Sequence, residues 1–218
     1  MKETRMFDFE IRAEQDETYG HFLTGQPIVY GVKTEMVHPK RGRFTEIIED
    51  GALAETDLRD VRFLVNHNTD MIPLARSRNN NENSTMQMEV VPGEGMMIRV
   101  NLDTENNADA RSLYSAVERG DLSGMSFMFT VDKDDWEELD AAEPVRHVRS
   151  IGRVLEVSAV TFPAYDATSI QTRGLSDSLE SGWDSLESAR AEKREIERRK
   201  HKIRILAEVN HGTERNEH

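Results

Sequence analysis

Short apolar runs, separated by Gly, Asn and Asp, dominate the chain between residues 28 and 162. Runs of this length that are rich in β-branched and aromatic residues and bounded by turn residues are typical of β-strands. They predict strands at residues 28–32, 61–67, 86–91, 96–102, 125–131 and 154–162. The Pro-Gly-Glu-Gly sequence between the third and fourth of these runs favours a hairpin. We therefore expect a mainly β core with antiparallel pairing.

Two stretches within this region are expected to be helical. Ala110, Leu113 and Val117 lie three and four positions apart, which predicts a helix over residues 104–119 that ends before a glycine. A shorter helix is expected over residues 44–53. The fold class that follows is α+β, mainly β with flanking helices.

The last part of the chain has a different composition. Residues 174–218 contain no proline and are dominated by Glu, Arg, Lys and Ala, with Leu179, Trp183 and Leu186 at helical spacing. The apolar stripe fades beyond these residues, so we expect a charged arm rather than a part of the core. The prediction is a domain at residues 1–173 and a helical or disordered arm after it, exposed to proteolytic trimming or free to bind a scaffold.

Composition excludes several classes of function. A formal net charge of −13 argues against a nucleic-acid partner, because phosphate binding needs a basic surface. No cysteine is present, so disulfides, thiol catalysis and thiolate metal sites are excluded. The histidines are scattered without the spacing of a metal site, and we expect no metal and no cofactor. The charged N-terminus and the lack of a long apolar run predict no membrane partner and a cytoplasmic location. The acidic stretch at residues 132–143 reads as a solvated loop.

Two residues that could carry chemistry lie in the predicted strands. His67 closes the apolar run at residues 61–67, and the end of a rigid strand is a good mount for a general base. Ser126 lies in a strand whose alternation puts it on the face opposite Phe127 and Phe129. Taken singly, a histidine at a strand end and a serine in a strand are more often structural. The serine also lacks the second glycine of the G-x-S-x-G hydrolase motif.

Glu156 is a carboxylate inside an otherwise apolar strand. Burying an ionised carboxylate is costly unless it is paired and hydrogen-bonded, so a partner is required. One interpretation is a salt bridge to Arg149 or Arg153. The other is a carboxylate that holds a histidine in the correct tautomer, as the third member of a nucleophile, base and orienter set. These two interpretations stay open on the residues alone.

Three segments of the chain form an ordered set. They are Phe-Leu-Val-Asn-His-Asn at residues 63–68, the segment ending in Leu-Ser-Gly-Met-Ser-Phe at residues 117–127, and Leu-Glu-Val-Ser-Ala-Val-Thr-Phe-Pro-Ala-Tyr at residues 155–165. Together they resemble the three blocks of the tailed-phage prohead proteases. The upstream segments at residues 42–46 and 51–53 also resemble the N-terminal portion of that family. The resemblance covers roughly residues 5 to 173.

The resemblance implies both a fold and a catalytic set. The fold would be a closed or partly open antiparallel β-barrel related to the herpesvirus assembly proteases. Ser126 would be the nucleophile, His67 the general base and Glu156 its orienter. An oxyanion hole is required as well, and Arg149 and Arg153 are candidates for anchoring it.

The resemblance also implies partners and a place of action. The enzyme would cleave segments of the major capsid protein and its scaffold, and trim itself, inside the procapsid that assembles in the host cytoplasm. Self-association into a homo-oligomer belongs to the same expectation. The rival hypothesis is a non-catalytic assembly module, in which the β domain packs passively and the arm serves as a scaffold.

Overall fold

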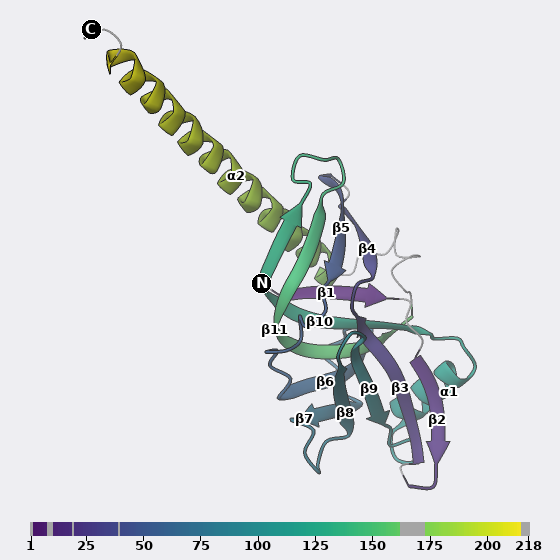
Figure 1. Ribbon diagram of the computed structural model, residues 1–218. Helices are drawn as coiled ribbons and strands as arrows, with labels where there is room; N and C mark the ends of the chain where they lie inside the picture. Colours follow the sequence, from purple (N-terminus) through teal and green to yellow (C-terminus); the bar gives the residue numbers. More distant parts are fainter. Residues whose placement is uncertain (1, 8–10, 19, 39, 162–172, 215–218) are drawn as a thin grey trace.

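The computed structural model describes residues 2–7, 11–18, 20–38, 40–161 and 173–214 (Figure 1). Within these residues the chain forms eleven strands and two helices. The strands are β1 (Lys2–Phe7), β2 (Ile11–Asp16), β3 (Gly20–Val29), β4 (Lys33–His38), β5 (Gly42–Ile48), β6 (Asp60–Val65), β7 (Ala75–Arg78), β8 (Met86–Val91), β9 (Gly95–Asn101), β10 (Gly124–Glu137) and β11 (Val145–Val160). The helices are α1 (Ala108–Glu118) and α2 (Arg173–Glu214). The expected α+β class, mainly β with helices beside it, is confirmed.

The strands divide into two sheets. The first has seven strands in the order β1-β10-β11-β5-β4, with β6 paired to β11 and β7 paired to β6. The second has four strands in the order β2-β3-β9-β8. The described strands form no closed barrel.

Strand β11 is the common member of the larger sheet. It is 16 residues long and pairs antiparallel with β10 along most of its length. On its other side the start of β11 pairs parallel with β5, and residues 156–159 pair parallel with β6. The expectation of purely antiparallel pairing was therefore wrong. Parallel pairing is possible because long connections separate β5 and β6 from β11. The sequence did not predict it, because a period-two pattern of apolar residues does not reveal strand direction.

Several expected elements are confirmed and three are wrong, one of them the strand at residues 28–32, of which only the first two residues lie in a strand, at the end of β3. The hairpin of β8 and β9 follows the predicted runs closely, and α1 lies inside the predicted helix at residues 104–119. The expected helix at residues 44–53 is instead the end of β5 followed by a turn, and Phe44, Glu46 and Ile48 of the strand are buried alternately, with a period of two. The acidic stretch expected to be a loop begins as the end of β10, which runs to Glu137.

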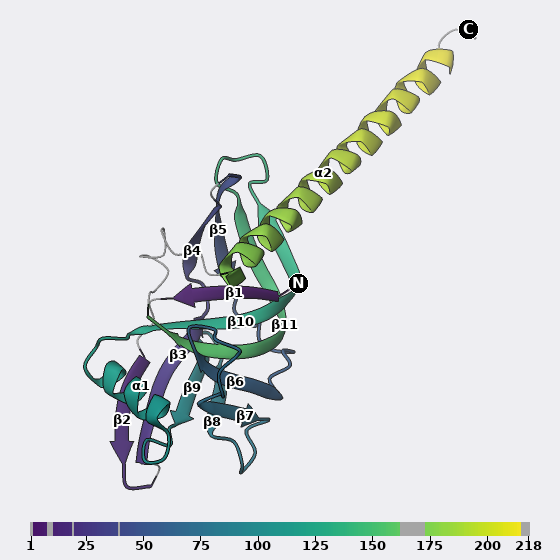
Figure 2. The same ribbon diagram turned by 180° about the vertical axis from the view of Figure 1, so that it is seen from behind.

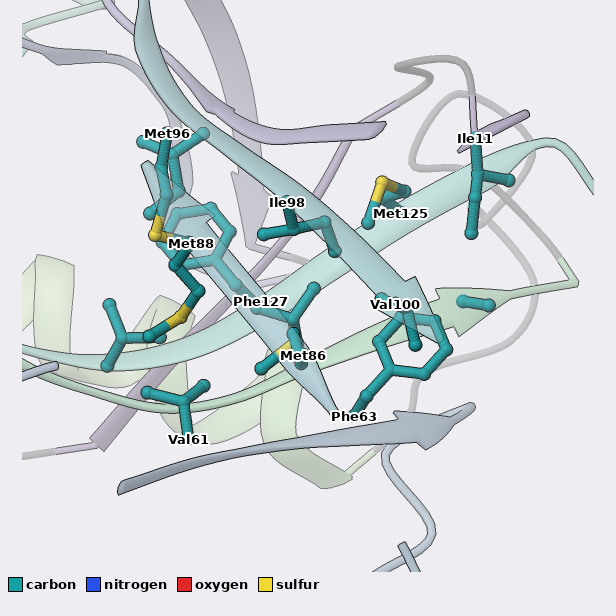
Figure 3. Packing of buried hydrophobic residues seen from close by; sticks show 14 of the residues in the cluster. Ile11, Val61, Phe63, Met86, Met88, Met96, Ile98, Val100, Met125 and Phe127 are labelled. Carbon is teal, nitrogen blue, oxygen red and sulfur yellow. The ribbon is translucent and has the colours of Figure 1, made fainter. Parts of the chain in front are cut away.

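The larger of two apolar clusters holds residues from both sheets (Figure 3). Phe127 and Phe129 of β10 are fully buried, and their rings stack with centroids 4.7 Å apart. Met86, Met96 and Ile98 of the smaller sheet lie around Phe127 in the same cluster. The predicted alternation along β10 thus puts its aromatic residues into the core, and Ser126 lies on the other face of the strand.

Helix α2 packs on the larger sheet only near its beginning, and then projects away from the body (Figures 1 and 2). Leu179, Trp183 and Leu186 are buried against Met36 and Phe44, on the two-stranded edge of β4 and β5. Further along, Ile196, Ile203, Ile205 and Leu206 are exposed. The predicted fading of the apolar stripe corresponds to the point at which the helix leaves the sheet.

Candidate active site

Three neighbouring strands bring the predicted catalytic residues to one region of the larger sheet. Ser126 of β10 lies directly opposite Ser158 of β11 in the strand register. Ser158 in turn lies opposite Leu64 of β6, and His67 follows β6 by two residues. Glu156 and Ser158 are two positions apart on β11, so both side chains extend from the same face of the sheet as Ser126.

The His67 ring is bonded to the Glu156 carboxylate. Nδ1 of His67 lies 2.5 Å from Oε1 of Glu156, and the two side chains are 11% and 4% exposed. A carboxylate accepts hydrogen bonds and does not donate them, so the contact makes Nδ1 the protonated nitrogen and leaves Nε2 to accept. This is the pairing that a base and its orienter require. The alternative, a salt bridge from Glu156 to Arg149 or Arg153, is not formed among the described residues.

The second oxygen of Glu156 is also bonded. Oε2 accepts a hydrogen bond of 2.6 Å from the hydroxyl of Ser158, which is completely buried. The same Ser158 oxygen accepts a hydrogen bond of 3.1 Å from the backbone N–H of His67. One hydroxyl therefore contacts both the main chain of the histidine and the carboxylate that holds its ring.

The backbone leading to His67 turns sharply out of β6. Asn66 and His67 both have positive φ, 52° and 57°, a left-handed conformation that is uncommon outside glycine. Asn66 is secured on both sides: its N–H donates to the carbonyl of Ala159, and its Oδ1 accepts from the N–H of Thr161. These bonds hold two consecutive left-handed residues and direct the His67 ring back over β11.

Ser126 is fully buried, and its hydroxyl does not bond to the histidine. The Ser126 hydroxyl donates a 2.6 Å hydrogen bond to the backbone carbonyl of Arg5, in the neighbouring strand β1. Nε2 of His67 is buried and has no hydrogen-bond partner within the described part of the chain. The His67 ring thus has a free acceptor, and the hydroxyl that was expected to bond to it is held by β1.

A group of buried charges fixes β1 beside β10. Glu3 and Arg5 of β1, Glu46 of β5 and Arg146 of β11 are each at most 2% exposed. Arg5 bonds to Glu3 and Glu46, and Arg146 donates to Glu3 at 2.8 Å and to Glu46 at 3.0 Å. Arg146 also donates to Asp134 of β10 at 2.6 Å. Every member has partners of opposite charge, which is the condition for keeping such groups away from water.

The ion pairs of this group shift the pKa values of Glu3 and Arg146 toward their charged forms. Burial by itself would raise the pKa of Glu3, but the ion pairs with Arg5 and Arg146 outweigh it and hold that pKa at about 2. The pKa of Arg146 is raised, because its carboxylate partners outweigh the cost of its burial. Glu3 and Arg146 therefore remain ionised at neutral pH.

The two arginines proposed as oxyanion anchors are occupied elsewhere. Arg149 donates to Asp135 at 3.0 Å and lies 3.7 Å from Glu49, and Arg153 lies 3.8 Å from Asp57. Both side chains are more than two-fifths exposed. In the described residues neither is bonded to Ser126 or His67, so their part in an oxyanion hole stays a prediction.

A second histidine forms a similar pair without a serine. Nδ1 of His147 lies 2.5 Å from Oε1 of Glu49, and Nε2 is 3.5 Å from Glu137. No hydroxyl bonds to this ring in the part of the chain that the structure describes. The His147–Glu49 pair is a natural reference for effects that are specific to His67 and Glu156.

Two features are absent from the residues that the structure describes. No three His, Asp or Glu side chains gather there in a way that could hold a metal ion. None of the helices found there has the length and apolar character needed to cross a membrane.

Sequence reasoning missed two contributors to this region. Ser158 had a signal, since it stands two positions after Glu156 and alternation puts both on one face of a strand. The carbonyl of Arg5 had none, because a backbone acceptor has no sequence signature and the partner of β10 was not predicted. Both become visible only from the strand order.

Comparison with known proteins gives one match. The model of the caudovirus prohead serine protease family matches residues 7–181 of the 218 in the chain. This span contains His67, Ser126 and Glu156. No curated protein and no solved structure matches the chain significantly.

Proposed function

The chain belongs to the caudovirus prohead serine protease family, and from that premise we propose that Ser126, His67 and Glu156 form its catalytic set. The family makes the protein a serine peptidase that acts in phage capsid maturation. The proposal assigns the nucleophile to Ser126, the general base to His67 and the orienting carboxylate to Glu156.

The observation that carries this assignment is the bond between His67 and Glu156. A buried carboxylate on Nδ1 and an unpartnered Nε2 give the imidazole the one tautomer that can accept a proton from a serine. Ser126 supports the assignment by its position, on the strand next to the one that carries Glu156 and on the same face.

The reaction follows from these roles. The Ser126 oxygen forms a bond to the scissile carbonyl carbon while its proton moves to Nε2 of His67, and Glu156 stabilises the resulting imidazolium. Collapse of the tetrahedral intermediate breaks the peptide C–N bond, and the same proton passes to the leaving amine. Water then attacks the acyl-enzyme, giving up a proton through His67, and the carboxylic acid product and the free serine are released.

For this reaction the Ser126 hydroxyl has to exchange its acceptor. Its hydrogen bond to the Arg5 carbonyl must be replaced by one to His67 Nε2, and Ser126 must become accessible to a peptide. Movement of β1 relative to β10 would provide both. The Ser126 hydroxyl would exchange one neutral hydrogen bond for another, but the Arg5 carbonyl would lose its donor and the buried ion pairs of β1 would have to rearrange, so the movement has a cost in free energy.

The finer features of the enzyme belong to the same proposal. We assign the fold to the type of the herpesvirus assembly proteases, as a partly open barrel whose two sheets share one apolar cluster. The substrates are segments of the major capsid protein and its scaffold, and the enzyme itself, inside the procapsid. Residues 1–173 are the protease domain, and the arm after it docks on scaffold or capsid helices, or on a second copy, which would raise the local concentration of substrate.

A capsid cleavage assay tests the catalytic set. The chain is co-expressed with the matching capsid protein, and masses of both are measured for the parent, Ser126→Ala, His67→Ala and the matched control His147→Ala. We expect cleavage by the parent and by His147→Ala, and loss of at least about 10³-fold in rate for the other two. Cleavage by Ser126→Ala at the parent rate would refute the assignment of the nucleophile.

The same assay tests the rival hypothesis of a non-catalytic assembly module. If the capsid protein stays intact with every variant, including the parent, the scaffold module becomes the better interpretation. Self-trimming is read from the mass of the enzyme: a C-terminal loss in the parent that is absent in Ser126→Ala supports it. Identical masses for both chains would contradict it.

A further inference from the structure

We propose that Ser158 is a positioning residue of the active site, whose hydroxyl orients His67 and Glu156 together. This inference rests on the proposed function, because it takes His67 as the base. It gives a role to a second serine of the same site, one that lies between the nucleophile strand and the histidine.

The inference starts from the two hydrogen bonds of one oxygen atom. The Ser158 hydroxyl donates its single proton to Oε2 of Glu156 at 2.6 Å and accepts the backbone N–H of His67 at 3.1 Å. A hydroxyl has one proton, and here the carboxylate takes it. The geometry therefore fixes the direction of both bonds.

Each bond restricts one movement of the His67–Glu156 pair. Without Ser158, the carboxylate of Glu156 would be held at one oxygen only, and rotation about its last bond would carry Oε1 away from His67 Nδ1. The second bond holds the main chain of His67, whose left-handed φ of 57° leaves its N–H without a strand partner. The ring is thus constrained through its own backbone and through its carboxylate.

The same two bonds argue against Ser158 as the nucleophile. Its proton points at a carboxylate oxygen rather than at an imidazole nitrogen, and the base nitrogen Nε2 is left without a partner. A residue that acts through others should change the rate more than it changes substrate binding, because misplacement of a catalytic group by about 1 Å costs on the order of 10²-fold in rate.

Proton NMR gives a readout that does not depend on finding a substrate. The Nδ1 protons of His67 and His147 are both bonded to carboxylates at 2.5 Å, so each should give a separate resonance far downfield. His67→Gln and His147→Gln assign the two signals. We expect Ser158→Ala to shift or broaden the His67 resonance beyond detection and to leave the His147 resonance unchanged.

Two further variants control for the loss of a buried hydroxyl. Ser77 is equally buried, and its hydroxyl donates to Asn80 at 3.2 Å, away from the catalytic pair. Ser77→Ala should therefore lower stability to a similar extent but keep both resonances. Ser158→Thr keeps a hydroxyl at the position, and we expect it to restore the His67 resonance at least in part.

The reaction rate is measured with a fluorophosphonate probe. Its phosphorus bonds to the serine oxygen, fluoride leaves, and the serine proton passes to His67. We expect Ser158→Ala to lower the maximal labelling rate by about 10–100-fold, with the half-saturating probe concentration within about twofold of the parent. Ser77→Ala should label at the parent rate, and Ser126→Ala should not label.

The variants distinguish a failure of the proposed function from a failure of the positioning role of Ser158. Labelling of Ser126→Ala at the parent rate overturns the proposed function. If Ser126→Ala is inert while Ser158→Ala matches Ser77→Ala in both rate and resonance, the positioning role alone is overturned. Complete loss of labelling in a folded Ser158→Ala, with the His67 resonance intact, also overturns it, because Ser158 would then take part in the chemistry itself.

Discussion

Glu156 combines a position inside the sheet with two hydrogen-bond donors. The donors are the ring of His67 and the hydroxyl of Ser158, and the residue as a whole is buried. Two donors on an otherwise buried carboxylate satisfy a group that the apolar strand around it would disfavour. A carboxylate is tolerated at this buried strand position because both of its oxygens are hydrogen-bonded.

Replacing this carboxylate with an amide tests its charge without changing its size. Glu156→Gln should lower the catalytic rate by about 10³–10⁴-fold, because the amide neither stabilises the imidazolium nor reliably selects the Nδ1 tautomer. The matched control is Glu49→Gln, which alters the His147 pair in the same way and should leave the rate unchanged. Cleavage of the capsid protein, followed by mass spectrometry, measures both. Equal rates for the two variants would contradict an orienting role.

At the scale of elements, the contact between α2 and β5 depends on the absence of a side chain. A Cβ atom added at Gly182 would lie 2.7 Å from the ring of Phe44, and both tryptophans lie edge-on to that ring, with centroids at 5.2 and 5.9 Å. The helix can approach the sheet this closely only at a glycine.

The substitution Gly182→Ala should therefore destabilise the protein, although alanine is the better helix former. We expect a loss of about 1–3 kcal/mol from overpacking, against the gain of about 1 kcal/mol usual at an exposed helix position. Unfolding in urea followed by tryptophan fluorescence measures it, since Trp136 and Trp183 both report on this contact. Ser188→Ala, at an exposed position of α2, is the control and should be neutral or slightly stabilising. A stabilised Gly182→Ala would mean that the helix does not sit this close.

Strand β1 is predicted to loosen in acid. The folded pKa of Glu3 is about 2, below its ordinary value of 4.5, so Glu3 contributes stability that is fully present above about pH 5. That contribution is lost as the pH falls from about 4.5 toward 2, because the unfolded chain then binds the proton first. Thermal unfolding followed by circular dichroism between pH 7 and pH 3 should show the decline.

The matched variant for this pH dependence is Glu3→Gln. It should be less stable than the parent at pH 7, because Arg5 and Arg146 lose a carboxylate partner, and its stability should fall less steeply with acid. Parallel curves for the two proteins would contradict the assignment of this pH dependence to Glu3.

Element by element, the sequence predicts what local pattern determines. The hairpin of β8 and β9 and the aromatic face of β10 follow from alternation and turn residues. The alternation of β5 is hard to recognise in the sequence, because Glu46 is polar on the buried face and Ile47 is apolar on the other face. Strands β1, β2 and β4 carry too many polar residues to stand out. The parallel contacts of β11 with β5 and β6 depend on the path of the chain, and so does the position of Ser158 between His67 and Ser126.

On the scale of the whole molecule, the chain departs from a compact shape. A compact protein of 218 residues has a radius of gyration of about 17 Å. Helix α2 has 42 residues, which corresponds to about 63 Å at 1.5 Å per residue, and most of it lies beyond the sheets (Figure 2). The arm therefore adds mass far from the centre.

Small-angle X-ray scattering of the monomer should give a radius of gyration several ångströms above that value. A chain ending at Ala191 keeps the contacts of Leu179, Trp183 and Leu186 and should return to the compact range with little change in stability. If the full chain scattered like a compact body, the distal part of the helix would have to fold back on the domain.

The length of α2 also sets the distance between the β domain and the far end of the helix. From Leu186 to the end of the helix there are 28 residues, or about 42 Å of rigid rod. If a partner bound the far end of α2, the domain would be held at roughly that distance from the binding point. Peptide segments directly beside that binding point would then stay uncleaved, and segments about one helix length away would be cut.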